Sequence, residues 1–379
     1  MPQLAKAKDC TGCAACSNAC AHEAITMTPI DRLGSLYPQV NNDACVECKL
    51  CEKVCPSLHP IEQKLPQKVF AAWSKDIEEN RKSTSGGLAT IFSKKILQAG
   101  GVVYGCSSMG TDVKHIRIDD IEDVDKLRGS KYVQSSIDDV FKRVRKDLLS
   151  KTRVLFIGTP CQVAGLLSFL RKPYENLLTV DLICHGTPSL RLLQEHEKKI
   201  APDKKVTKVG FRDSGSYVLK LYSGNDLIYS SNLWKKRYED AYYNAFIRGY
   251  TFRESCYRCR YAHKERCSDV TIGDFWGLGK EIPFRSESPN AGISVALVNT
   301  DKGKQFLSAN TDALYLSDRP LDEAVNGNPQ LKSPKKKTLA MKVFRHLYLK
   351  NGFSLKGALY TTDFYLLPIY YILNKIRNR

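Results

Sequence analysis

The first 56 residues contain one cysteine pattern twice. It reads CTGCAACSNAC at residues 10–20 and CVECKLCEKVCP at residues 45–56, so successive cysteines are separated by two, two and three residues. Eight of the 14 cysteines of this 379-residue chain fall in the two copies. A disulfide framework of a secreted protein does not explain clusters this tight in a chain this long. The pattern therefore predicts metal-bound thiolates in a reducing compartment, and we expect a cytoplasmic protein.

The spacing predicts two [4Fe-4S] clusters. Three thiolates of one copy can wrap a cubane cluster while the fourth reaches the neighbouring cluster. Structural zinc is the alternative, but zinc sites usually pair Cys-x2-Cys with a distant second pair rather than with a third cysteine at the same spacing. The predicted ligands are Cys10, Cys13, Cys16 and Cys55 for the first cluster, and Cys45, Cys48, Cys51 and Cys20 for the second.

Composition and charge narrow the class of partner. The chain has 58 Lys and Arg against 40 Asp and Glu, a net charge of +18. Each bound [4Fe-4S] cluster lowers this by about 2, so even three clusters, the two above and a third site predicted below, would leave about +12. The basic residues are spread along the chain without a nucleic-acid motif, so we expect no nucleic-acid partner. Neither a signal peptide nor a membrane span is expected, because the longest apolar stretch, residues 364–373, is half of the ~20 residues that cross a bilayer. This basic, aromatic end predicts a peripheral membrane contact or, alternatively, a helix packed on the domain.

Beyond a linker at residues 56–68, strand and helix signals alternate. Strands are predicted at 69–73, 101–105, 153–157 and 177–183, helices at 87–99, 163–171 and 189–200, and a hairpin at 218–222 and 227–230. We therefore expect an α+β and α/β multidomain chain. It would consist of a bacterial-type ferredoxin fold (1–62), a mixed α/β domain in two parts (69–150 and 151–316) and a C-terminal helical extension (317–379).

Four further cysteines predict a third metal site. Cys161 stands at a predicted helix start, where the helix dipole favours a thiolate, and Cys184 ends the next predicted strand. In parallel α/β sheets these two positions meet at one edge. With Cys256 and Cys259 they would hold a third [4Fe-4S] cluster. A redox-active Cys161 and a zinc site are the alternatives, and Cys267 could replace Cys184 as a ligand or be a buried free thiol.

Six motifs in order carry a resemblance to a known family. They are STSGG at 83–87, RGSKYVQS at 128–135, GTPCQ at 158–162, ICHG at 183–186, SCYRC at 255–259 and DVTIGDFWG at 269–277. This series resembles that of the family of coenzyme F420 hydrogenase/dehydrogenase beta subunits. The resemblance implies an FAD-containing iron–sulfur oxidoreductase with a mixed α/β flavin-binding domain.

Two polar turns could hold the flavin. The backbone N–H groups at 83–87 can bind a phosphate or a flavin edge, unless this is an ordinary helix cap. The turn at 129–135 offers a cation, a ring and an amide, unless it is a solvated loop. The predicted cofactor-binding residues are Ser83, Ser85, Gly86, Gly87, Gly129, Ser130, Lys131, Tyr132, Gln134, Ser135 and Thr159. We assign no catalytic residue, because His185 and Asp274 have ordinary structural explanations.

These features predict an oxidoreductase that passes electrons between a one-electron carrier and an organic two-electron acceptor, in either direction. Its redox partner would be ferredoxin, flavodoxin, or a reduced deazaflavin or nicotinamide carrier. Relatives with this N-terminal fusion often resemble products of polysaccharide-synthesis gene clusters, which implies a sugar-linked substrate. The alternative is a non-catalytic electron-transfer subunit of a larger redox complex.

Overall fold

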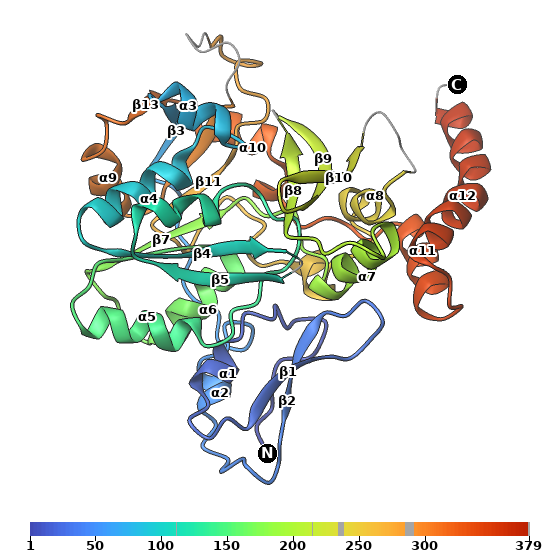
Figure 1. Ribbon diagram of the computed structural model, residues 1–379, viewed down its shortest axis with the longest axis horizontal. Coiled ribbons are helices and arrows are strands. Elements are labelled where there is room, and N and C mark those ends of the chain that lie inside the picture. The colour runs from blue at the N-terminus through green and yellow to red at the C-terminus, as the bar shows by residue number, and fades with distance from the viewer. Residues whose placement is uncertain (111, 214, 234–238, 285–291, 378–379) are drawn as a thin grey trace.

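The N-terminal module forms the lower part of the molecule in Figure 1. The computed structural model describes the chain except residues 111, 214, 234–238, 285–291 and 378–379, and the side chains after Leu366 also lie outside the described part. The module contains an antiparallel pair, β1 (Ile25–Pro29) and β2 (Leu36–Val40), and two short helices, α1 (Ala15–Ala19) and α2 (Leu50–Lys53). Residues 56–67 lie between the module and β3, whose first residue, Lys68, falls at the end of the linker predicted at 56–68.

The body is built on a mixed sheet of eight strands, in the order β13-β3-β12-β11-β7-β6-β4-β5. The central strands β4, β6, β7 and β11 are parallel, whereas the other pairs are antiparallel. The strands are β3 (Lys68–Ser74), β4 (Val102–Met109), β5 (Asp112–Ile118), β6 (Val154–Gly158), β7 (Leu177–Leu182), β11 (Val270–Asp274), β12 (Ser294–Val298) and β13 (Leu314–Asp318).

Helices cover both faces of this sheet. Along β6, Phe156 packs with the face that carries α5 (Val140–Leu149) and α6 (Pro160–Leu170), whereas Leu155 points to α4 (Leu88–Gln98). This alternation follows from the two-residue period of a strand. The helix α1 of the module contacts α5 and α6, so the module adds to the helical layer that α5 and α6 form on one face of the sheet. The remaining elements here are α3 (Ile77–Lys82), η1 (Ile121–Leu127), α9 (Asp301–Ser308) and α10 (Leu321–Gly327).

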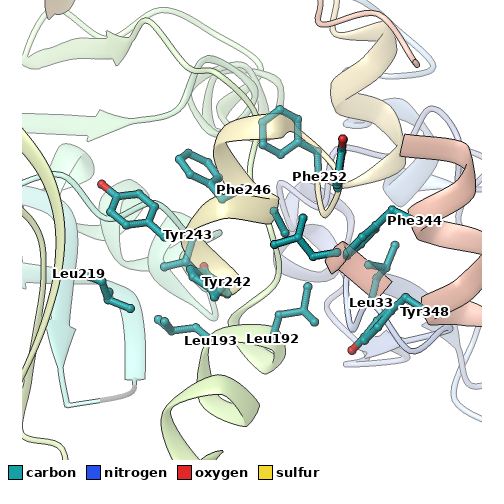
Figure 2. Close-up of a cluster of buried hydrophobic side chains, with 14 of the residues drawn as sticks. Leu33, Leu192, Leu193, Leu219, Tyr242, Tyr243, Phe246, Phe252, Phe344 and Tyr348 are labelled. Atoms are coloured by element: carbon teal, nitrogen blue, oxygen red, sulfur yellow. The ribbon is translucent and has the colours of Figure 1, made fainter. Parts of the chain in front are cut away.

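A second core joins the module, the middle of the chain and its C-terminal part. Figure 2 shows Leu33 of the module beside Leu192, Phe344 and Tyr348. The elements of this core include an antiparallel three-stranded sheet, β8 (Lys208–Asp213), β9 (Ser216–Ser223) and β10 (Asp226–Asn232). Its helices are α7 (Leu190–Ile200), α8 (Ala241–Arg248), α11 (Leu339–Leu349) and α12 (Leu355–Arg377), and the short helices η2 (Glu254–Arg258) and η3 (Pro329–Leu331) connect them to the large sheet.

The C-terminal residues therefore contribute to the body. The edge strand β13 ends at Asp318 and pairs with β3, and Phe344, Leu359 and Leu366 are buried in the second core. Within the described residues, no helix combines the length and the apolar character that a bilayer crossing needs. The predicted membrane contact at residues 364–373 concerns side chains that, after Leu366, lie outside the described part.

Candidate functional site

The four cysteines predicted for the first cluster surround one small cavity in the module. Burial raises the pKa of the Cys13 thiol to about 12, and the neighbouring thiols of Cys10 and Cys55 act in the same direction. The pKa of Cys16 is raised in the same way by burial and then by Cys13, Cys10 and Cys55. Four thiols gathered in a buried space repel one another as thiolates, so they fit a group that carries positive iron at its core.

The two cysteine copies share an unusual backbone. Gly12 and Ala14, on either side of Cys13, have φ of 67° and 62°, and Glu47 and Lys49 at the equivalent positions have φ of 52° and 56°. Three of these four are not glycine, and strained left-handed residues of this kind concentrate at functional sites. The second copy thus turns around Cys48 as the first copy turns around Cys13.

The second set of thiols lies at the outer side of the module. Cys48 is exposed, and its charge acts on Cys51, whose pKa burial raises. The Cys20 thiol accepts a hydrogen bond from the Ala24 N–H over 3.3 Å. Because α1 packs against α2, the ends of the two copies are adjacent. The ligand roles of Cys20, Cys45, Cys48 and Cys51 stay a prediction.

The third set comes together at the carboxyl ends of β6 and β7. Cys161 is the second residue of α6, which a capping box formed by Thr159 and Gln162 begins. Burial raises the pKa of Cys161 to about 12, and the charges of Cys259 and Cys256 add to this. Burial also raises the pKa of Cys184, with further contributions from Cys256, Cys161 and Cys259. The sheet edge and η2 therefore bring all four predicted thiols to one place.

Cys267 lies close to this set without the same neighbours. Burial raises its pKa, and Asp181 and Cys161 raise it further. Its thiol donates to the Pro160 carbonyl over 3.8 Å. The charges of Cys256, Cys161 and Cys259 all act on Cys184, whereas Asp181 and then Cys161 act on Cys267. Cys184 as the fourth member of the set stays a prediction.

Within the described ranges, no three His, Cys, Asp or Glu side chains converge as the ligands of a single metal ion do. A cubane cluster places its four thiolates on four different irons. Its ligands therefore surround a larger volume than the ligands of one ion. The four cysteines of the first set line one common cavity and are of this surrounding kind.

The first and third sets meet at one junction. A Cβ added to Gly165 of α6 would lie 2.9 Å from the Cys13 sulfur, so the module rests directly on this helix. The buried Tyr261 ring lies near Cys13, Cys161 and Cys267, whose charges raise the pKa of its hydroxyl after the larger effect of burial.

A cavity of about 470 Å³ opens on the other side of the third set. Its volume lies in the range of sites for cofactors and drug-sized ligands. Cys184 lines it, so the cavity and the third set share a wall. The lining includes nine of the residues predicted to bind a cofactor: Ser83, Ser85, Gly87, Gly129, Ser130, Lys131, Tyr132, Ser135 and Thr159.

Two predicted cofactor-binding residues lie outside this lining. The Gly86 N–H donates to the Ser294 hydroxyl, and a Cβ at this position would lie 2.3 Å from the Ala72 carbonyl oxygen, so Gly86 permits close packing of β3. The Gln134 amide points away from the cavity to the module, where it donates to the Thr11 carbonyl over 3.1 Å.

The side chains at the cavity give it an excess of positive charge. Burial lowers the pKa of Lys131 to about 8, and its ammonium donates to the carbonyls of Leu127 and Arg128. Burial also lowers the pKa of Lys335, which donates to the Ile247 carbonyl over 2.8 Å. Neither lysine forms an ion pair among the described residues. The nearby Arg212 guanidinium is instead neutralised by Asp274 at 3.1 Å.

Sequence reasoning missed three other cavity residues. Burial lowers the pKa of His115 to about 4, so the neutral ring donates from Nε2 to the Ile157 carbonyl and accepts from Ser135 at Nδ1. Gln330 has a buried amide oxygen without a partner in the described part of the chain. Lys335 arrives from beyond the predicted domain. No local motif marks these residues, because each comes from a different element.

Comparison with known proteins identifies two domains. Residues 9–58 match the family described as "4Fe-4S dicluster domain", and residues 151–324 match the family for the C terminus of the beta subunit in coenzyme F420 hydrogenase/dehydrogenase. The chain is 26% identical over 217 residues to the F subunit of F(420)H(2) dehydrogenase of Methanosarcina mazei, covering 54% of this chain and 60% of that protein. It is 27% identical over 184 residues to the coenzyme F420-dependent sulfite reductase of Methanocaldococcus jannaschii, covering 47% and 28%.

Among solved structures, a chain of the F420-reducing [NiFe] hydrogenase complex from Methanosarcina barkeri aligns with a TM-score of 0.45 and 17% identity, over 70% of this chain and 90% of that one. The chain spans less than two thirds of the length of both curated relatives. Its N-terminal module is a 4Fe-4S dicluster domain, and its residues 151–324 form a domain that matches the C terminus of the coenzyme F420 hydrogenase/dehydrogenase beta subunit.

Proposed function

We propose that the protein is an iron–sulfur flavoprotein oxidoreductase, which exchanges electrons between a one-electron carrier and an organic two-electron substrate. One observation carries this proposal. The third thiol set lies between the dicluster module and the cavity, because Cys161 neighbours Cys13 on one side and Cys184 lines the cavity on the other. An arrangement of this kind serves electron transfer into a substrate site and has no evident use in a purely structural protein.

The residues present fit an FAD at the cavity. Tyr132 offers a ring, and two lysines without acidic partners among the described residues, Lys131 and Lys335, suit a phosphate or another anionic group. The unpartnered Gln330 amide suits the polar edge of a ring system. A bound flavin would supply the exchange between one-electron and two-electron chemistry. The chain itself would orient the ligand, exclude water and supply positive charge.

The outer side of the module suits the redox partner. Cys48 is exposed there, and Val46, two residues before it, is 57% exposed. We propose that a ferredoxin, a flavodoxin or a reduced deazaflavin or nicotinamide carrier exchanges electrons at this end. The organic substrate would bind at the cavity, and its anionic group would face the lysines. A sugar-linked substrate is compatible with such a site.

Metal and flavin quantitation tests the proposal. Anaerobically purified protein is expected to contain about twelve irons per chain, four for each cubane, together with one FAD. Cys256→Ser should lower the iron content to about eight and leave the dicluster signals unchanged. Cys106→Ser is the matched control, because Cys106 lines the cavity but belongs to none of the three thiol sets.

The competing function is a non-catalytic electron-transfer subunit. About eight irons, no flavin and no response to Cys256→Ser would establish that function and remove the third cluster. The relative that is named as one subunit of a larger enzyme gives this alternative its weight.

A further inference from the structure

Arg253 is a fully buried cation at the junction of the module and the body. Only 1% of the residue is exposed, and it is among the largest side chains buried to this extent. Its backbone N–H donates to the Thr187 carbonyl over 2.9 Å, which fixes it just before η2 and the third thiol set. From this position the side chain enters the module.

The guanidinium contacts the first cysteine copy directly. Nε donates to the Cys10 carbonyl over 2.7 Å, and Nη2 lies 3.4 Å from the Cys10 sulfur. Nη1 lies 3.4 Å from the Gln134 amide oxygen, and the guanidinium carbon lies 4.1 Å from the centre of the Tyr37 ring. A Cβ at Gly12 would lie 2.6 Å from Nη1, so the glycine leaves room for this group.

Arg253 forms no ion pair with a carboxylate among the residues that the structure describes. A buried charge without a counter-charge is costly, so buried cations are normally paired. The anionic groups within reach here are thiols. The arginine contacts Cys10 of the first set, and its charge also acts on Cys161 and Cys256 of the third set.

We propose that Arg253 is the counter-charge of the first cluster and raises its reduction potential, with a smaller effect on the third cluster. This inference rests on the proposed iron–sulfur function. One added electron changes a cubane with four thiolates from about −2 to about −3. A fixed cation in a buried site stabilises the more negative state. Arg253 is thus a positioning residue. Its single positive charge acts on both the first and the third cluster, and so on the electron transfer between them.

A reductive titration with dithionite, followed by EPR and visible absorbance, tests the proposal on the iron-loaded full-length chain. In Arg253→Met, at a fixed solution potential, the ratio of reduced to oxidised first cluster should fall at least tenfold, which is 59 mV for a one-electron couple. Arg253→Lys keeps the charge but loses the fork-shaped donor, and its shift should be less than half as large. The second cluster serves as the internal reference and should not move.

Arg32→Met is the matched control. Arg32 also joins the module to the body, since it donates to the Tyr348 carbonyl over 2.8 Å and lies over that ring at 4.5 Å. Its loss weakens the attachment of the module without changing the charge beside Cys10. All three couples should keep their potentials in this variant.

Two results would overturn the inference: no couple shifts in Arg253→Met, or Arg253→Lys shifts as far as Arg253→Met. If Arg253→Met does not retain iron, Arg253→Gln takes its place as the neutral variant, and a tenfold shift in Arg253→Lys would by itself overturn the idea. Failure of the proposed function is separate, because it would show as a missing third couple in the unmodified protein. The two couples of the dicluster domain would still report on Arg253.

Discussion

Replacing Gly165 with alanine should destabilise the iron-loaded protein, although alanine is the better helix former. Gly165 lies inside α6, where this exchange normally adds about 1 kcal/mol to the free energy of unfolding. Here the new Cβ would lie 2.8 Å from the Cβ and 2.9 Å from the sulfur of Cys13, and 3.3 Å from the Phe141 ring. Ordinary carbon contacts are about 3.5–4.0 Å. Because a ligated Cys13 is not free to rotate away, the overpacking cost of about 1–3 kcal/mol should exceed the gain.

The net effect is a loss of about 1 kcal/mol. It should lower the midpoint at which the visible absorbance of the clusters is lost on heating, by about 2–4 °C per kcal/mol for domains of this size. Gly357→Ala in α12 is the control, because the one contact of its new Cβ shorter than 3.5 Å is the Ser354 hydroxyl at 3.1 Å, which belongs to an exposed side chain that can shift. If Gly165→Ala raised the midpoint as the control should, the close contact between the module and α6 would be wrong.

Cys184→Ser should lose about four irons, whereas Cys267→Ser should lose none, because the charges of Cys161, Cys256 and Cys259 all act on Cys184, whereas Asp181 and then Cys161 act on Cys267. The reverse result in iron quantitation would exchange the roles of Cys184 and Cys267. Burial lowers the pKa of Lys131 to about 8, so its positive charge is lost as pH rises through 8, and FAD affinity measured by fluorescence should fall above that pH in the unmodified protein but not in Lys131→Met. Burial lowers the folded-state pKa of His115 to about 4, below its unfolded value of about 6.5, so its contribution is complete above pH 6.5 and is lost toward pH 4. Urea unfolding should show this loss, up to about 3 kcal/mol, and His115→Phe should flatten the dependence; an unchanged slope would mean that His115 is not buried as a neutral ring.

The sequence predicted the parallel centre of the fold well, because its signals are local. Gly158–Pro160 and Ser189 mark helix starts, and the strands before them are short apolar runs, so β6, α6, β7 and α7 begin and end within a few residues of their predicted bounds. The strands β5, β11, β12 and β13 were not predicted. Both β12 and β13 pair with β3, which lies more than 200 residues earlier in the chain. Their partner therefore cannot be predicted from neighbouring residues.

The candidate site shows the same division. The cysteines and the two glycine-rich turns could be identified from spacing and motif. The orientation of Gln134 toward the module could not, because it depends on where Thr11 and Arg253 come to rest. Lys335 and Gln330 could not be predicted either, because they reach the cavity only when the C-terminal residues fold back onto the body.

The three thiol sets differ in when they can be completed during synthesis. All eight cysteines of the first two sets lie within the first 55 residues, so they are available while most of the chain is still unmade. The third set forms only after β6 and β7 have paired and η2 has been placed beside their ends. It is complete only when Cys259 has been added to the chain. Such long-range contacts form late in folding. Iron insertion should therefore proceed in two stages, and a species with only the dicluster module filled is the expected precursor of the mature protein.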